Sequence, residues 1–338
     1  MCIGDDLARD PSYGKRMRRA RTAVLTILAL SIGMFVVIAA LAMLNEGVGR
    51  FLGTLASINV FYYALALACV LLSTMIGFPK WDMFLRKLGI RLQWQQNFAI
   101  YQSMFSMDIT PGRWGRAVVA YTINRLKGVR FGKTFPAVVA DILTDFLGFI
   151  AVAIVTSFLV HSYTLVSVAI SILLLIPFVF IYVKAPYVWF KRKMRRRRIL
   201  KGVFKTADLY FASSRSLDIG TYLYAMLFTV PSVVLSSLAL YFVVLSFGIN
   251  LTPDFIPTML FIYTSSLLIG MVTGIPGTLG VTDAAMLGYL VAFLGGVGVT
   301  FGIAAAIVIF YRIASMWFTE GVSTAFLMYT LRYWRVRR

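Results

Sequence analysis

Apolar runs long enough to cross a lipid bilayer recur along the whole chain, and they constrain its fold more than any other feature. An α-helix needs about 20 apolar residues to cross a hydrocarbon core roughly 30 Å thick. Of the 338 residues, 60% are hydrophobic and only 14% are charged, too few to cover a soluble domain of this size. The chain is therefore predicted to be an all-α integral membrane protein. About six full spans are expected, at 22–44, 55–78, 134–160, 162–186, 219–247 and 299–325.

Two further apolar stretches, 95–127 and 254–294, are interrupted by proline and glycine, at 110–112 and 274–277. Proline removes a backbone donor and glycine permits non-helical dihedral angles, so each interruption should end a helix. The arms of the first stretch, about 16 residues or about 24 Å long, are shorter than the hydrocarbon core. Each stretch is therefore predicted to be a re-entrant, Pro-Gly-broken helical hairpin that enters and leaves on one side of the membrane.

Both interruptions carry the motif Pro-Gly-x-x-Gly, at 111–115 and at 276–280, and the two copies are 165 residues apart. The same offset superposes the spans that flank one hairpin on the spans that flank the other. Two span–hairpin–span units are therefore predicted, a first repeat at 55–160 and a second at 219–325, within a single membrane domain that covers 1–338.

Lysine and arginine set the predicted topology. The chain carries 33 of them and has a formal net charge of +20. With the N-terminus in the cytoplasm, the predicted external loops contain only Arg50, and the cytoplasmic segments contain nearly all the others, including the four at 79–93, as the positive-inside rule requires. Both termini are then cytoplasmic, in the cell membrane, and the two units face opposite ways. Such an inverted repeat is the architecture of many transporters.

The basic cytoplasmic connection 187–218 holds the densest charge, at Lys191–Arg198. This segment is interpreted as a positive-inside anchor, as a docking patch for anionic lipid headgroups, or as both. Nucleic acid is not an expected partner, because the basic residues lie between apolar runs without a base-stacking platform.

Motifs for catalysis and for metal binding are absent from the sequence. It contains no phosphate-binding P-loop, no serine-hydrolase elbow and no dinucleotide-binding fingerprint. The single histidine, His161, excludes a histidine-cluster metal site, and Cys2 and Cys69 form no CxxC motif. We therefore expect a protein that is not an enzyme and that holds no metal or cofactor.

Charged side chains within the membrane segments are candidate functional residues, because each costs roughly 2.5–3.5 kcal/mol or more near the bilayer centre. Arg113 and Arg116 lie three residues apart at the opening of a helix and could clamp a phosphate together with the helix dipole. Alternatively, they reach the cytoplasmic surface or pair with Asp108. The candidate substrate-binding residues are Arg113, Arg116, Arg312, Gly112, Gly115, Gly277 and Gly280.

The carboxylates within the membrane segments could have any of three roles. Asp141 and Asp145 are four residues apart and share a helical face. They could brace the fold against Arg116 or Arg312, contact the substrate, or carry protons, with Asp145 as the first choice for a proton carrier. The candidate coupling or bracing carboxylates are Asp108, Asp141, Asp145, Asp283 and Glu320.

The two hairpin tips, the helix after the first tip and a residue pair in the last span carry a resemblance to a known family. They are Thr110–Arg116, Gly128–Phe131, Asp141, Asp145, Ile275–Ala285 and the pair Tyr311-Arg312. Together they resemble the lysylphosphatidylglycerol synthase transmembrane-region family, whose second signature is P-G-G-L-G-V-x-E-A-A. The chain departs from the family pattern at 141 and 283, where aspartate replaces glutamate, and at 142, where isoleucine replaces arginine.

The resemblance implies movement of lipids with polar heads across the bilayer. Members include the flippase half of aminoacyl-phosphatidylglycerol enzymes and archaeal proteins linked to polyprenyl-phosphate sugars in glycosylation. Synthase activity is not expected, because the chain has no aminoacyl-transferase domain. The expected function is that of a flippase for a phosphate-bearing membrane lipid, a polyprenyl-phosphate sugar or an aminoacylated phospholipid. A secondary transporter of a small anion, a membrane-embedded lipid-phosphate transferase and a membrane scaffold are the alternatives.

Overall fold

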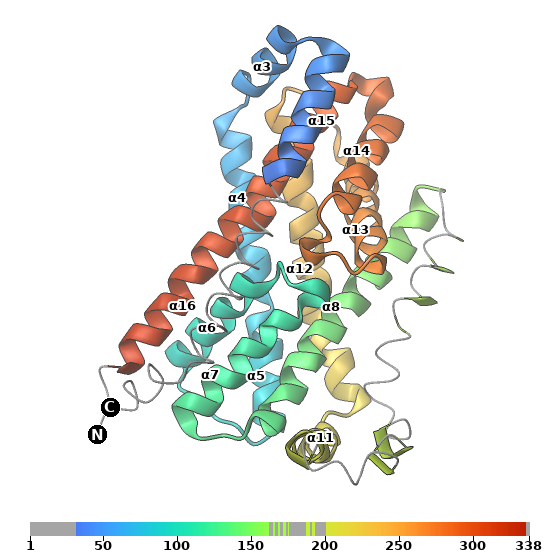
Figure 1. The fold of residues 1–338 in the computed structure, drawn as a ribbon. Helices are drawn as coiled ribbons and strands as arrows, with labels where there is room; N and C mark the ends of the chain where they lie inside the picture. The colour runs from blue at the N-terminus through green and yellow to red at the C-terminus, as the bar shows by residue number, and fades with distance from the viewer. Residues whose placement is uncertain are drawn as a thin grey trace.

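A computed structural model describes residues 32–161 and 201–335, with isolated positions between 165 and 192. Over these residues the chain forms helices joined by short connections, and no strand occurs among them. Figure 1 shows the long helices running side by side along one axis. Most of the predicted span 162–186 and the first part of the span 22–44 lie outside the described residues.

The prediction of an all-α integral membrane fold is confirmed. In the described part, five helices are long and apolar enough to cross a membrane, or six if the bent pair Ile32–Glu46 and Val48–Ala56 (α3) is one span. The five are Val60–Lys87 (α4 and α5), Phe131–Leu159 (α8), Ile219–Ser246 (α12), Pro253–Val272 (η4 and α13) and Phe301–Thr330 (α15, η7 and most of α16).

The first of these spans extends beyond its predicted end at residue 78. Helix α4 (Val60–Ile76) meets α5 (Phe78–Lys87) at Gly77, and the two continue as one span. Helix α5 follows the apolar run because Phe78, Trp81 and Leu85 recur at helical spacing and are buried. The inward face of α5 therefore continues well below the point at which hydropathy alone would end the span.

The first hairpin has two short arms, α6 (Trp94–Ser103) and α7 (Val118–Lys127). Each arm has 10 residues, about 15 Å, which is too short to cross the hydrocarbon core and is in keeping with a re-entrant hairpin. The α-helical arms are shorter than the predicted 16 residues because the tip is built from two 3₁₀ turns, η1 (Met104–Met107) and η2 (Pro111–Ala117).

The second hairpin consists of α13 (Ile256–Val272), the turn η5 (Pro276–Thr278) and α14 (Val281–Leu294). Its arms are longer than those of the first hairpin, and α13 together with η4 reaches spanning length. The two hairpins approach from opposite ends of the molecule, the first in teal and the second in orange in Figure 1. Their tips meet, since η2 contacts η5 and the side chain of Ile109 packs against Gly277.

The two halves share an order of elements: a long helix, a first hairpin arm, a tip with 3₁₀ turns, a second arm and a final long helical segment. They also share an unusual backbone conformation. The third residue of each Pro-Gly-x-x-Gly motif, Arg113 in one and Thr278 in the other, has a left-handed φ, of 60° and 54° respectively. Such angles are uncommon outside glycine. These likenesses are of the kind that two repeated units would share, while the units and the symmetry relation between them stay predictions.

Basic residues concentrate at one end of the described molecule, where α5 and α7 finish and α8 begins, lower in Figure 1. They are Arg86, Lys87, Arg91, Arg125, Lys127, Arg130 and Lys133. The opposite end, at α3, carries Arg50. This distribution agrees with the charge asymmetry, and the orientation in the membrane stays a prediction. The predicted lipid-docking segment Lys191–Arg198 lies mostly outside the described residues, although Lys191 pairs with Asp208 of α11 (Lys201–Ser214) at 2.6 Å.

Candidate functional site

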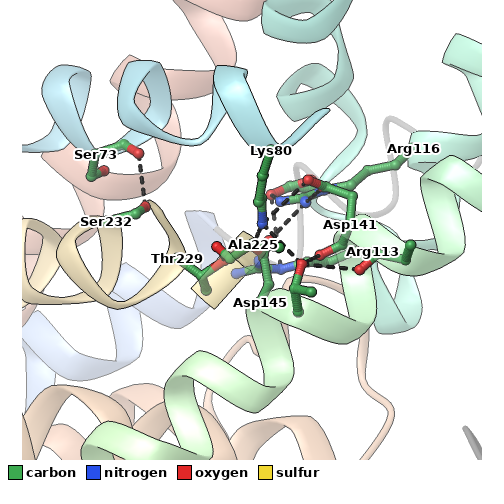
Figure 2. A network of polar contacts seen from close by, with 12 residues as sticks. Ser73, Lys80, Arg113, Arg116, Asp141, Asp145, Ala225, Thr229 and Ser232 are labelled. Carbon is green, nitrogen blue, oxygen red and sulfur yellow. Dashed lines mark hydrogen bonds and ion pairs between the residues drawn. The ribbon is translucent and has the colours of Figure 1, made fainter. Parts of the chain in front are cut away.

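Six charged side chains meet where the first hairpin tip packs against α5 and α8, and we call them the six-charge cluster. They are Lys80, Asp108, Arg113, Arg116, Asp141 and Asp145. Figure 2 shows Lys80 of α5 and the two arginines of η2 converging on the two aspartates of α8. The cluster thus joins three separate segments of the first half of the chain.

Arg116 is the centre of the cluster and is only 1% exposed. Its Nε and Nη2 atoms donate to the two carboxylate oxygens of Asp108, at 2.5 and 2.6 Å. Its Nη1 atom donates to both Asp141 and Asp145, at 2.8 Å each, and the guanidinium stacks over the ring of Phe105. Because all three nitrogens are engaged by carboxylates, these contacts favour the bracing alternative for Arg116, and its role as a phosphate ligand stays a prediction.

Lys80 belongs to the cluster but was not among the sequence candidates. The sequence places it in the predicted cytoplasmic segment 79–93 with no sign of burial, and in the structure it is only 2% exposed. Its Nζ atom lies 2.5 Å from Asp145 and 3.2 Å from Asp141, and it also donates to Thr144. The available signal was the helical spacing of buried residues after 78, which carries Lys80 inward with them.

Arg113 is the least constrained of the three cations. Its Nη1 atom donates to Asp145 at 3.0 Å, its Nε atom lies 3.8 Å from Asp108, and its side chain is 20% exposed. Its guanidinium lies over the ring of Phe149, 5.3 Å from the centroid. Non-glycine residues with left-handed backbone angles, such as Arg113, cost of order 1–3 kcal/mol each and are concentrated at functional sites.

The cluster contains three cations and three carboxylates, so its formal charge is zero. Charges inside a membrane protein are tolerated when they pair with one another. A carboxylate bound to three cations is a poor proton carrier, because its protonation would leave three buried cations facing two carboxylates. The contacts of Asp145 with Lys80, Arg113 and Arg116 therefore favour bracing for this residue.

The second hairpin has its own ion pair, between Asp283 at the start of α14 and Arg312 at the end of α15 (Phe301–Arg312). Asp141 and Asp145 were possible partners of Arg312, but the structure pairs Arg312 with Asp283 instead. Asp283 also accepts the backbone N–H of Gly280 at 2.9 Å, which caps α14. The Nη2 atom of Arg312 is buried and has no hydrogen-bond partner among the described residues.

A π-helical segment, η7 (Ile313–Phe318), separates Arg312 from Thr319 and Glu320. These two residues open α16 (Thr319–Arg335). π-Helical turns are rare and are frequent at functional sites. This turn joins a buried cation at one end to a carboxylate at the other.

A cavity of about 140 Å³ lies between the two hairpin tips and the segment from α15 to α16. Its polar lining includes Asp108, Arg113, Thr278, Arg312, Thr319 and Glu320. A second cavity of about 110 Å³ reaches Lys80, Arg116 and the hydroxyls of Ser73 and Ser232. Arg113 and Thr319 line both cavities, so these two residues lie where the cavities adjoin.

The glycines of the two motifs shape the tips. A Cβ atom on Gly115 would lie 2.7 Å from the carbonyl oxygen of Met107, which explains why no larger residue fits there. Gly277 and Gly280 have left-handed φ angles of 63° and 83°, which glycine adopts readily. Gly112 lies within η2. A direct role of these four glycines in holding a headgroup stays a prediction.

Comparisons with known proteins agree with this architecture. The family described as the lysylphosphatidylglycerol synthase TM region matches residues 26–320. A UPF0104 membrane protein of Methanothermobacter thermautotrophicus is 22% identical, over 87% of this chain and 89% of its own length. The family description names a membrane lipid, which indicates a function related to membrane lipids. The chain is a multi-pass membrane protein and belongs to the lysylphosphatidylglycerol synthase TM region family.

Proposed function

We propose that the protein is a flippase that moves a phosphate-bearing lipid from one leaflet to the other. The observation that carries this proposal is the guanidinium of Arg312, which lines the cavity between the hairpin tips and has a buried Nη2 with no partner in the described part of the chain. An arginine with free donors in a membrane cavity is suited to an anion, and its planar fork matches a phosphate.

The remainder of the cavity is suited to a lipid headgroup. Its wall is partly apolar, with Phe105, Phe146, Met271 and Met286 beside the charged groups. The headgroup would enter between the tips, while the acyl or prenyl chain stays in the bilayer. The substrate would be a polyprenyl-phosphate sugar or an aminoacylated phospholipid. The protein would act as a transporter rather than an enzyme, in the cell membrane with both termini cytoplasmic, and 191–198 would contact anionic headgroups.

A flipping assay in proteoliposomes tests the proposal. Two probes are used, a fluorescent phosphatidylglycerol and a fluorescent prenyl-phosphate sugar, and dithionite quenches the outer leaflet. We expect at least one probe to cross faster than in empty vesicles. Arg312→Lys should lower that rate roughly tenfold, because lysine keeps the charge but loses the two-pronged contact with phosphate.

Arg86→Lys is the matched control, since Arg86 is exposed at the far end of α5 and pairs with Asp82. It should transport at the unaltered rate. Equal crossing of both probes with and without protein contradicts the flippase proposal. Uptake of radiolabelled phosphate without movement of either lipid would instead favour the small-anion transporter.

A further inference from the structure

One carboxylate at the cavities has no counter-charge. The six-charge cluster is neutral, and Arg312 and Asp283 neutralise each other. Glu320 is the remaining charged residue that lines either cavity, and no ion pair to it is present in the described part of the chain. The interior thus carries one uncompensated negative charge whenever Glu320 is ionised.

Around Glu320, the described part of the chain offers no cation that is not already paired with another carboxylate. The titratable or charged groups that line the same cavity are Asp108, Arg113, Tyr263, Tyr311 and Arg312. Helix α6, which packs against α16, carries Tyr101, which lines the second cavity. Both arginines already pair with other carboxylates. The carboxylate of Asp108 repels that of Glu320, which increases the need for a positive charge from elsewhere.

Next to Glu320, a buried hydroxyl lacks a partner. Thr319 is 8% exposed, its Oγ1 atom has no hydrogen-bond partner among the described residues, and it lines both cavities. Ser315, one turn earlier in η7, lines the same two cavities. A carboxylate with neighbouring hydroxyl oxygens is a suitable ligand set for a hard monovalent cation.

We propose that Glu320 and Thr319 bind one monovalent cation from solution, a proton or a sodium ion, during each transport cycle. The part of this inference that concerns transport rests on the proposed function, whereas the site itself rests on the charges and the unpartnered hydroxyl. The π-helical segment η7 has Arg312 before it and Thr319 immediately after it. The anion site and the cation site therefore lie at the two ends of one short segment, where occupancy of one electrostatically favours occupancy of the other.

The transport test uses the same proteoliposomes and the fluorescent probe that moves in them, with the membrane potential clamped by potassium and valinomycin. A roughly tenfold gradient of sodium or of protons is imposed. One cation coupled to each lipid should shift the steady-state leaflet ratio by up to about tenfold. Glu320→Gln should abolish this shift. Glu46→Gln should retain it, because Glu46 caps α15 through the N–H of Gly302, a contact that glutamine can also accept.

The inference is overturned if unsubstituted protein and Glu320→Gln both move the probe and neither gradient changes the leaflet ratio in either protein. Movement of no probe at all contradicts the proposed function, and the cation site is then decided by stability. The thermal midpoint of detergent-purified protein is followed with pH and with sodium, using choline as the ionic-strength control.

A bound cation raises the midpoint as its concentration rises. We expect Glu320→Gln to lose the response to one cation and Glu46→Gln to keep it. Identical responses in all three proteins contradict the site. If Glu320→Gln does not fold, Glu320→Asp replaces it. This variant keeps the charge and should respond at higher cation concentration, whereas a midpoint independent of both cations in Glu320→Asp and in the unsubstituted protein also contradicts the site.

Discussion

Ion pairs join each hairpin tip to the long helical segment that follows it, but the charges on the tip and on the segment are reversed between the two halves. In the first half the tip supplies the cation, Arg116, and α8 supplies the carboxylates Asp141 and Asp145. In the second half the tip supplies the carboxylate, Asp283, and α15 supplies the cation, Arg312. An arrangement of elements can therefore recur in the two halves while the charged residues that hold it change sign.

The two tips also differ in how many ion pairs hold them. The first tip is held by a cluster that reaches α5 through Lys80, so several contacts must break before it moves. Among the residues that the structure describes, the second tip is held by one ion pair, and its arginine has a donor, Nη2, without an acceptor. This difference predicts that the second tip separates from its helix more easily than the first.

Removing the centre of the six-charge cluster should give the largest effect. Arg116→Met leaves three carboxylates facing two cations, and breaking a buried ion pair costs about 3–5 kcal/mol. Unfolding of the detergent-solubilised protein by heat or denaturant measures this loss. Lys87→Ala is the control, because Lys87 and its partner Asp218 are both exposed, and such pairs contribute about 0–1 kcal/mol. A similar small loss for both variants would mean that the first tip is not held by its charges.

Removing Lys80 should cost less, because Asp145 keeps two arginine partners. Lys80→Met is expected to lower the free energy of unfolding by about 2–3 kcal/mol, the contribution of a hydrogen bond to a charged group. Adding Asp141→Asn restores the balance of charges within the cluster. The double variant should therefore be less destabilised than the sum of the single variants, with a coupling energy of about 0.5–3 kcal/mol. If the losses of the two single variants simply add in the double variant, Lys80 does not interact energetically with Asp141.

The motif glycines should differ in how they can be replaced. Gly277→Ala should lower the free energy of unfolding, measured as for the other variants, by about 1–2 kcal/mol, because the left-handed conformation is unfavourable for residues with a Cβ atom. Gly277→Asn should be milder, since asparagine tolerates that conformation better. Gly115→Ala fails instead for lack of space beside Met107, so Gly115→Asn should be worse than alanine. Equal ranking of the two substitutions at both glycines would contradict this distinction.

Neutralising the ion pair between Arg312 and Asp283 should have the smallest effect on stability. Arg312→Met combined with Asp283→Asn removes both charges and keeps an acceptor for the N–H of Gly280. Removing both partners of a buried pair is often nearly neutral, so we expect a change of about 1 kcal/mol or less. Flipping of the lipid probe should nevertheless fall to the rate of empty vesicles. Loss of folding in this variant would mean that the ion pair of the second tip is needed for stability as much as the six-charge cluster is.

The sequence was most informative where the signal is local. Proline and glycine mark both tips, and the spacing of Asp141 and Asp145 places them on one face of α8, where Arg116 meets them. Partners from distant segments were harder to foresee. Lys80 lies 65 residues from Asp145 in the chain, and its position just after an apolar run is typical of a residue at the membrane surface.

The partner of Arg312 and the π-helical turn η7 were equally inaccessible to sequence reasoning. The sequence offered Asp141 and Asp145 as partners of Arg312, whereas Asp283 takes that place because the second tip folds back onto α15. No residue type marks a π-helical turn in advance, and this one became visible only in the backbone of the last span. Both features depend on how the second hairpin packs.

The neutrality of the six-charge cluster has an electrical consequence. Moving one elementary charge through the field of an energised membrane takes about 2.3 kcal/mol per 100 mV. A group of three cations and three carboxylates that moves as one body does no net electrical work, and neither does the pair of Arg312 and Asp283. A rearrangement that keeps the cluster and the pair together is therefore electrically silent. Among the described residues that line the cavities, Glu320 is the one whose charge is left for voltage to act on, together with the proposed cation and lipid headgroup.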